Sequence, residues 1–232
     1  MCTSNDPRDK RGRTSVFIQH EGLDLLIDTS TELRSQALAA GLNHVDAVLF
    51  THAHADHTGG FDDLRRFNEL AQAHLPIYAS PETAEMLRDR FAYAFSDAFP
   101  FYGGKPDLTL HEVSDPFEIA GVRVVPIPVW HGQMKVLGFR FGPLAYVTDA
   151  KTVPEESRAA LRGVDTLVIN ALRDRPHPTH LSISEALEII AELQPRAAYL
   201  IHLSHEISHA EASALLPEGV DVAYDGLDIE TA

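Results

Sequence analysis

The pattern of hydrophobic and polar positions predicts a chain that mixes strands and helices and changes its period along its length. Between 108 and 147, apolar and polar residues alternate, which predicts an antiparallel stretch with turns at Gly121, Gly132 and Gly142. Elsewhere, short apolar runs predict strands at 15–19 and 23–27, which form a hairpin, and at 47–50, 76–79, 166–169, 198–201 and 220–224. Helical spacing predicts helices at 31–40, 61–73, 81–91, 154–161, 182–193 and 206–216. No repeat or linker interrupts this order, so we predict a single domain over residues 1–232.

Composition and charge narrow the function classes. The net charge of −15, from 34 acidic and 19 basic residues, argues against binding long nucleic acid but is compatible with a small anionic substrate if metal ions supply the attraction. No apolar run has the length of a bilayer span, and the first residues lack a signal-peptide core, so we expect no membrane contact. The single cysteine excludes an internal disulfide and fits the cytoplasm. The basic run within 6–13 is interpreted as a solvated entry loop, with phosphate contact as the alternative.

One stretch carries most of the chemistry. His52, His54, Asp56 and His57 follow directly after the apolar run 47–50, which reads as a buried strand. Imidazoles and a carboxylate delivered from a rigid strand into a loop are typical of a metal site. Gly59 and Gly60 are expected to free the backbone to turn into the next helix.

Three further strands end in candidate ligands, namely His131, Asp149 and His202. Side chains at strand ends converge on one rim of a sheet even when they are distant in sequence, and such a donor set suits Zn, Fe or Mn. Asp28 also follows a strand. Two roles are open for it: capping the helix at 31–40, or orienting a metal-bound imidazole.

The order of these residues resembles the binuclear metallo-β-lactamase superfamily over nearly the whole chain. The resemblance implies an α/β (α+β) fold, a four-layer αββα sandwich with two mixed sheets. It also implies two divalent ions, Zn or Mn with Fe as a further candidate. By the same resemblance His52, His54 and His131 hold one ion, Asp56, His57 and His202 hold the second, and Asp149 bridges them.

Residues 2–8, 79–83, 91–95 and 176–182 look like the PhnP-like phosphodiesterases, the accessory enzymes of carbon–phosphorus lyase pathways. In such enzymes a histidine matching His180 contacts the phosphoryl group; the alternative is that His180 caps the helix from Ser182. Family members usually begin with a further strand and several cysteines that bind a structural zinc. Here Cys2 alone remains, with His205 beyond the last ligand, so a complete zinc site is not predicted. One explanation is that Met1 is a start inside a longer reading frame.

The function predicted from these features is a binuclear metal-dependent phosphodiesterase on small or cyclic phosphodiesters, using a metal-bridging hydroxide. Asp56 would ligate one ion and accept the proton of water, and His180 would contact the phosphoryl group or protonate the leaving oxygen. A thioester or lactone hydrolase on the same site is one alternative, and a non-hydrolytic iron-binding redox or sensing module is another.

Two further segments leave alternatives open. The aromatic segment Phe91–Gly104 is interpreted as a lid or a homodimer patch, with core packing as the alternative. Arg173 and Arg175 are candidates for a second substrate phosphate, with loop solubility as the other explanation.

Overall fold

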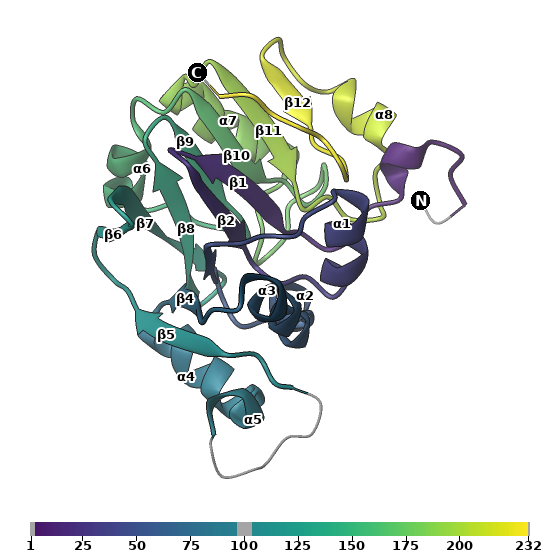
Figure 1. The fold of residues 1–232 in the computed structure, drawn as a ribbon. Helices are drawn as coiled ribbons and strands as arrows, with labels where there is room; N and C mark the ends of the chain where they lie inside the picture. The colour runs from purple at the N-terminus through teal and green to yellow at the C-terminus, as the bar shows by residue number, and fades with distance from the viewer. Residues whose placement is uncertain (1–2, 97–103, 232) are drawn as a thin grey trace. The chain divides into compact units, whose positions relative to one another are not determined.

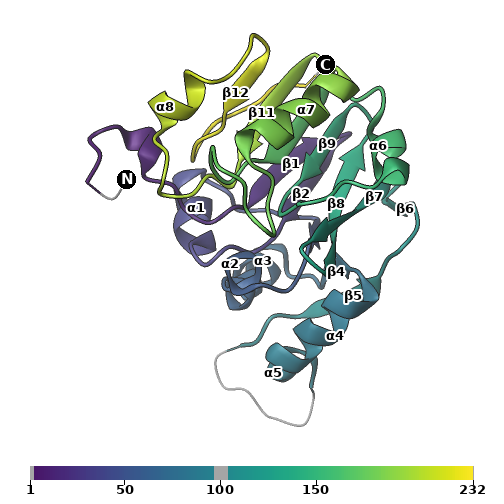
Figure 2. The ribbon, with the colours of Figure 1, turned by 180° about the vertical axis from the view of Figure 1, so that it is seen from behind.

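The computed structural model describes residues 3–96 and 104–231. Its contacts divide the chain into two compact units, residues 12–122 (the first unit) and residues 1–11 with 123–232 (the second unit). Each unit is described by itself (Figures 1 and 2). The single-domain organisation expected from the sequence stays a prediction.

The first unit is built on a sheet with the strand order β1-β2-β3-β4-β5. Its strands are β1 (Val16–His20), β2 (Leu23–Ile27), β3 (Ala47–Leu49), β4 (Leu75–Ala79) and β5 (Leu108–Glu112). The β1–β2 hairpin is antiparallel, as predicted, and the remaining pairs are parallel. The helices are α1 (Leu33–Ala39), α2 (Ala55–Thr58), α3 (Leu64–Ala71), α4 (Pro81–Arg90) and α5 (Ala92–Phe95), and a 3₁₀ turn, η2 (Phe61–Asp63), precedes α3.

The place of β5 corrects the prediction of one antiparallel stretch over 108–147. β5 pairs in parallel with β4 and therefore belongs to the sheet of the first unit. A parallel pair needs a crossover connection, and the chain between the two strands supplies one in α4 and α5, which lie beside β5 in Figure 1. A period of two marks a strand but does not say which neighbour it pairs with, which is why the pattern failed here.

The second unit contains a sheet with the order β12-β11-β10-β9-β8-β7. Its strands are β7 (Val122–His131), β8 (Met134–Phe141), β9 (Leu144–Val147), β10 (Thr166–Asn170), β11 (Ala197–Ile201) and β12 (Val220–Val222); β6 (Phe117–Ile119) precedes them in the chain. β7, β8 and β9 are antiparallel neighbours, and β9 to β12 are parallel. Helices α6 (Glu155–Leu161), α7 (Ile183–Leu193) and α8 (His209–Ser213) accompany it, with α7 beside β11 in Figure 2.

Helix ends follow their capping residues rather than the apolar pattern alone. Ser182 starts α7 with a capping box, because its hydroxyl accepts from the Glu185 N–H while the Glu185 carboxylate accepts from the Ser182 N–H. The helix predicted at 206–216 is shorter, since α8 starts only after a second capping box at Ser208. The helix predicted at 61–73 divides into η2 and α3. Within the described residues, no helix is long and apolar enough to cross a membrane.

Asp9 and Arg11 fasten the N-terminal segment of the second unit to the turn after β11, while Arg8 and Lys10 are exposed, as predicted for a solvated loop. The Arg11 guanidinium donates to the carbonyls of Ser204 and Ile207, each at 2.9 Å. Asp9, which is 7 % exposed, accepts from the Ser4 hydroxyl at 2.6 Å and from the His209 N–H at 2.7 Å. These donors hold the pKa of the Asp9 carboxyl below its ordinary value.

Asp9→Asn is therefore expected to lower the free energy of unfolding at pH 7 by about 1 kcal/mol. A carboxyl whose pKa is lowered by folding contributes stability above its unfolded pKa, about 3.9, and loses it as the pH falls through the folded value. The difference between variant and wild type should thus shrink in acid. Urea unfolding at pH 7 and near pH 3 measures it, with the exposed Asp221→Asn as control. A gap that stays constant over that range would contradict the expectation.

Gly59 and Gly60 are needed for close approach rather than for backbone freedom, which corrects the prediction. Their φ angles are −64° and −90°, which any residue adopts. A Cβ at Gly60 would lie 2.4 Å from the Ser30 carbonyl oxygen, and one at Gly59 would lie 2.4 Å from Thr31 Cγ2. The chain after α2 therefore passes against the segment that follows β2.

Gly60→Ala is expected to lower the free energy of unfolding by about 3 kcal/mol, because backbone must move to admit the methyl group. Gly163→Ala is the matched control: its Cβ meets open space, and only its φ of +76° costs about 1 kcal/mol. Urea unfolding of both variants checks this. Equal losses in the two would show that packing at Gly60 is not the cause.

Candidate metal-binding site

The predicted ligands form two clusters, one in each unit. The histidine-loop cluster comprises His52, His54, Asp56 and His57 of the first unit. The Asp149 cluster comprises His131, Asp149, His180 and His202 of the second unit. Each cluster is assembled by elements of its own unit.

The histidine-loop cluster is presented by the end of β3, whose residues are all buried. The chain leaves the sheet there and turns into α2, which carries Asp56 and His57. The ring centroid of His52 lies 4.6 Å from that of His54 and 4.3 Å from that of His57. Asp56 Oδ2 lies 3.6 Å from His57 Nε2. The structure therefore brings together the four side chains that the sequence placed in this loop.

Asp28 supports this cluster and does not cap a helix. Its Oδ2 lies 2.7 Å from His57 Nδ1 and accepts from the Thr51 hydroxyl at 2.7 Å, while its Oδ1 accepts from the Thr51 N–H at 2.8 Å. The residue at the start of α1 is Glu32, so the capping alternative is excluded. Burial raises the pKa of the Asp28 carboxyl, and the contacts with His57 and Thr51 oppose that rise.

Arg90, on α4, hydrogen-bonds to the histidine loop and to α2. Its guanidinium donates to the Ala53 carbonyl and, at 2.8 Å, to the Thr58 hydroxyl. That hydroxyl in turn donates to the His54 carbonyl at 2.9 Å. The sequence contained no signal for this contact, because Arg90 lies 32 positions beyond Thr58 and reads as an ordinary helix-end cation.

The Asp149 cluster is built from the ends of three strands and one loop. Asp149, which is 2 % exposed, has its Oδ1 2.9 Å from His180 Nε2 and 3.4 Å from His202 Nε2. His131, at the end of β7, places Nδ1 2.8 Å from the Thr179 carbonyl, which accepts its proton and leaves Nε2 with the lone pair. Ligand atoms of His131, Asp149 and His180 all lie within 4.8 Å of one another.

His180 belongs to this cluster and is not a helix cap, since Ser182 caps α7. Its ring centroid lies 4.5 Å from that of His131 and 5.1 Å from that of His202. His177, which the sequence analysis did not single out, lies beside this cluster, with its Nδ1 3.3 Å from His180 Nδ1. Burial, followed by the neighbouring His180, lowers the pKa of His177.

Backbone strain is concentrated at three of these residues. Asp28, Asp149 and His202 have φ angles of +61°, +57° and +60°, in the left-handed region that costs a residue with a side chain about 1 kcal/mol or more. Each follows the end of a strand. Asp is among the residues that tolerate this region best, and so is His.

Other sequence candidates lie elsewhere or outside the described residues. Both Arg173 and Arg175 pair with Glu206, at 2.6 Å each, so their guanidinium groups are already engaged. Cys2 and residues 97–103 lie outside the described residues. Within the described part of the aromatic segment, Phe91 stacks on Phe61 at 4.2 Å, which is core packing.

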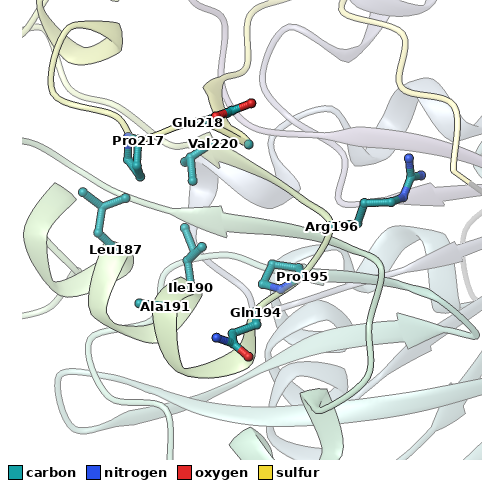
Figure 3. A pocket seen from close by; sticks show the side chains of 10 residues that line it. Leu187, Ile190, Ala191, Gln194, Pro195, Arg196, Pro217, Glu218 and Val220 are labelled. Carbon is teal, nitrogen blue, oxygen red and sulfur yellow. The ribbon is translucent and has the colours of Figure 1, made fainter.

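The cavity shown in Figure 3 is separate from these clusters. It has a volume of about 310 Å³ and lies in the second unit between the end of α7 and the turn before β12. Leu187, Ile190 and Pro217 line it, and Arg196 and Glu218 are its two charged residues. No residue of the Asp149 cluster is among those that line it, so it is not the site of the predicted chemistry.

The donor set fits a divalent transition metal. Imidazoles whose Nδ1 is hydrogen-bonded to a carbonyl or carboxylate present Nε2 to a metal, and carboxylates complete such a site. His57 and His131 both have this arrangement.

Comparisons with known proteins agree with these features. The chain is 38% identical to a crystal structure described as a new diphosphatase from the PhnP family, with a TM-score of 0.91, covering 100% of this chain and 89% of that one. It is 40% identical to an octanoyltransferase of Porphyromonas gingivalis over 98% of this chain but 46% of the relative, so it spans about half of that protein. It is 29% identical to a ribonuclease Z of Mycobacterium sp. strain KMS, over 72% of this chain and 65% of the relative.

The predicted fold class and the predicted resemblance to PhnP-family proteins are both confirmed by these matches. Both sheets are mixed and carry helices. Residues 24–203 match the model of the Beta-lactamase superfamily domain, and the chain therefore belongs to that family.

Proposed function

We propose that this protein is a binuclear metal-dependent phosphodiesterase that acts on small or cyclic phosphodiesters. The observation that carries the proposal is the similarity, along the whole chain, to a PhnP-family diphosphatase. A diphosphatase and a ribonuclease both cleave bonds to phosphorus, and both are similar to this chain. The two clusters of imidazoles and carboxylates support the same chemistry.

In this proposal both clusters supply ligands. His52, His54 and His131 would hold one ion, Asp56, His57 and His202 would hold the other, and Asp149 would serve both. Bound divalent ions supply activation of water at neutral pH and charge compensation for the phosphoryl oxygens. Either Zn or Mn suits this donor set, and Fe is a further candidate.

The remaining steps belong to side chains of the protein. Asp56, whose carboxylate is 40% exposed, would accept a proton from the attacking water. His180 would contact the phosphoryl group or donate a proton to the leaving oxygen. Its Nε2 lies 2.9 Å from Asp149 Oδ1. Asp28 would keep the His57 ring in its ligand orientation through the 2.7 Å contact.

The charge of the chain points to a small substrate. With a net charge of −15, a long polyanion would be repelled, whereas a small phosphodiester is attracted by ions within the site. This is the reason for favouring small or cyclic phosphodiesters over RNA, despite the ribonuclease relative.

A second candidate function is hydrolysis of acyl thioesters or lactones on the same metal site. The match to an octanoyltransferase over nearly the whole of this chain favours it. The match covers 46% of that relative, so the acyl transfer in its name is a property of a protein about twice as long as the matched part. The phosphodiesterase proposal therefore ranks first.

The test is a substrate panel with defined metal content. Purified protein loaded with Zn²⁺ or Mn²⁺ is assayed with bis(p-nitrophenyl) phosphate, cyclic and linear phosphodiesters, a diphosphate and octanoyl thioesters. We expect turnover of phosphodiesters that is lost with a chelator and restored by metal. If no phosphorus substrate is turned over while thioesters are cleaved, the second candidate function replaces this proposal. Iron as the dominant metal, with visible absorbance and no hydrolysis, would favour the redox or sensing alternative.

A further inference from the structure

We propose that the Thr51 hydroxyl is a positioning group that links the Asp28 carboxylate to His52 through two hydrogen bonds. One buried carboxylate would then fix the tautomer of two proposed metal-binding imidazoles. This inference rests on the proposed metal site and adds a residue that is not among the proposed metal ligands. It concerns only side chains of the first unit. Its readouts do not require activity of the metal-loaded enzyme.

The direction of the two hydrogen bonds at Thr51 follows from the single proton that its hydroxyl can donate. Thr51 Oγ1 lies 2.7 Å from Asp28 Oδ2 and 3.0 Å from His52 Nδ1. A hydroxyl has one proton, and it is donated to the carboxylate, which is the stronger acceptor. Towards His52 the oxygen therefore acts as acceptor. The neutral His52 ring must then carry its proton on Nδ1 and its lone pair on Nε2.

The same Asp28 oxygen determines the tautomer of His57 by a direct contact. Its Nδ1 lies 2.7 Å from Asp28 Oδ2, so the neutral ring likewise carries its lone pair on Nε2. His52 and His57 are 1 % and 0 % exposed, and their rings lie 4.3 Å apart. One carboxylate oxygen thus determines the tautomer of both rings, directly in one case and through a hydroxyl in the other.

Thr51 suits this task because it is held at two points. Its N–H donates to Asp28 Oδ1 at 2.8 Å while its hydroxyl donates to Oδ2, and it is fully buried. A β-branched side chain restricts χ1, so the hydroxyl keeps its direction between the two partners. Valine has the same shape without the hydroxyl, and serine has the hydroxyl without the methyl group.

The experiment compares Thr51→Val, Thr51→Ser and the control Thr83→Val, which removes a buried hydroxyl of α4 in the same unit. Long-range ¹H–¹⁵N spectra of the metal-free proteins report the tautomer of His52, and competition with a chromophoric chelator reports Zn²⁺ affinity. In Thr51→Val we expect a His52 population protonated on Nε2 and a Zn²⁺ affinity lower by about 10- to 100-fold. Thr51→Ser should keep the wild-type tautomer and an affinity within about 3-fold, and Thr83→Val should keep both.

Two results would overturn the inference. One is a wild-type tautomer and Zn²⁺ affinity in Thr51→Val; the other is a loss in Thr51→Ser as large as in Thr51→Val. If Thr51→Val does not fold, Thr51→Ala takes its place, because it also lacks the hydroxyl and makes smaller demands on packing. Failure of the phosphodiesterase proposal is distinguishable, since it would show in the substrate panel while tautomer and metal affinity follow the expected pattern.

Discussion

Asp149→Asn is expected to lower metal-dependent hydrolysis by about 10³-fold and to weaken metal binding at the same time. The carboxylate is 2 % exposed, and two imidazole Nε2 atoms lie 2.9 Å and 3.4 Å from its Oδ1. Asparagine keeps the size of the side chain and tolerates the φ of +57°, so the substitution removes the negative charge and little else. Loss of that charge removes the group that would serve both ions.

Metal content after dialysis, together with turnover of bis(p-nitrophenyl) phosphate, measures the effect. Asp165→Asn, at an exposed carboxyl of the same unit, is the matched control and should behave like wild type. An Asp149→Asn protein that binds two ions and keeps more than about a tenth of its activity would remove Asp149 from the site.

His180→Ala should give the second-largest loss, about 10²-fold in kcat, with the metal content unchanged. The reason is the proposed proton donation to the leaving oxygen from an imidazole beside Asp149. A poor leaving group such as an alkoxide needs that proton, whereas p-nitrophenolate leaves without it. The loss should therefore be larger for an alkyl phosphodiester than for bis(p-nitrophenyl) phosphate.

Comparing the two substrates separates proton donation from metal ligation. Because ligand atoms of His180, Asp149 and His131 all lie within 4.8 Å of one another, metal ligation by His180 is the competing role. If His180 is a metal ligand, His180→Ala would lower the metal content and would reduce the turnover of both substrates equally. The exposed His111→Ala in the first unit is the control for loss of an imidazole.

Local chemistry in the sequence was enough to name the candidate ligands that come together in each unit. A strand of three apolar residues followed by four candidate ligands within six positions is a short-range arrangement, which neighbouring residues suffice to form. The hairpin of β1 and β2 and the capping box of α7 were equally local. The resemblance to a known superfamily followed from the same residues and was confirmed by the family match.

Interactions between distant positions were decided only in three dimensions. Asp28 had two equal roles in the sequence, and contacts 23 and 29 positions away, with Thr51 and His57, selected one of them. Arg90 reaches the histidine loop from a separate helix. β5 paired with β4 rather than with the strands that follow it, because pairing depends on the crossover and on the partner edge.

The sequence by itself determined which residue types stand at the strand ends, and hence the class of chemistry. The tertiary structure decided how those residues are held, through the left-handed turns at Asp28, Asp149 and His202 and the close approach at Gly60. The physical reason is that donor chemistry and periodicity belong to neighbouring residues. Tautomers, strain and packing depend on groups that only the folded chain brings within a few ångströms.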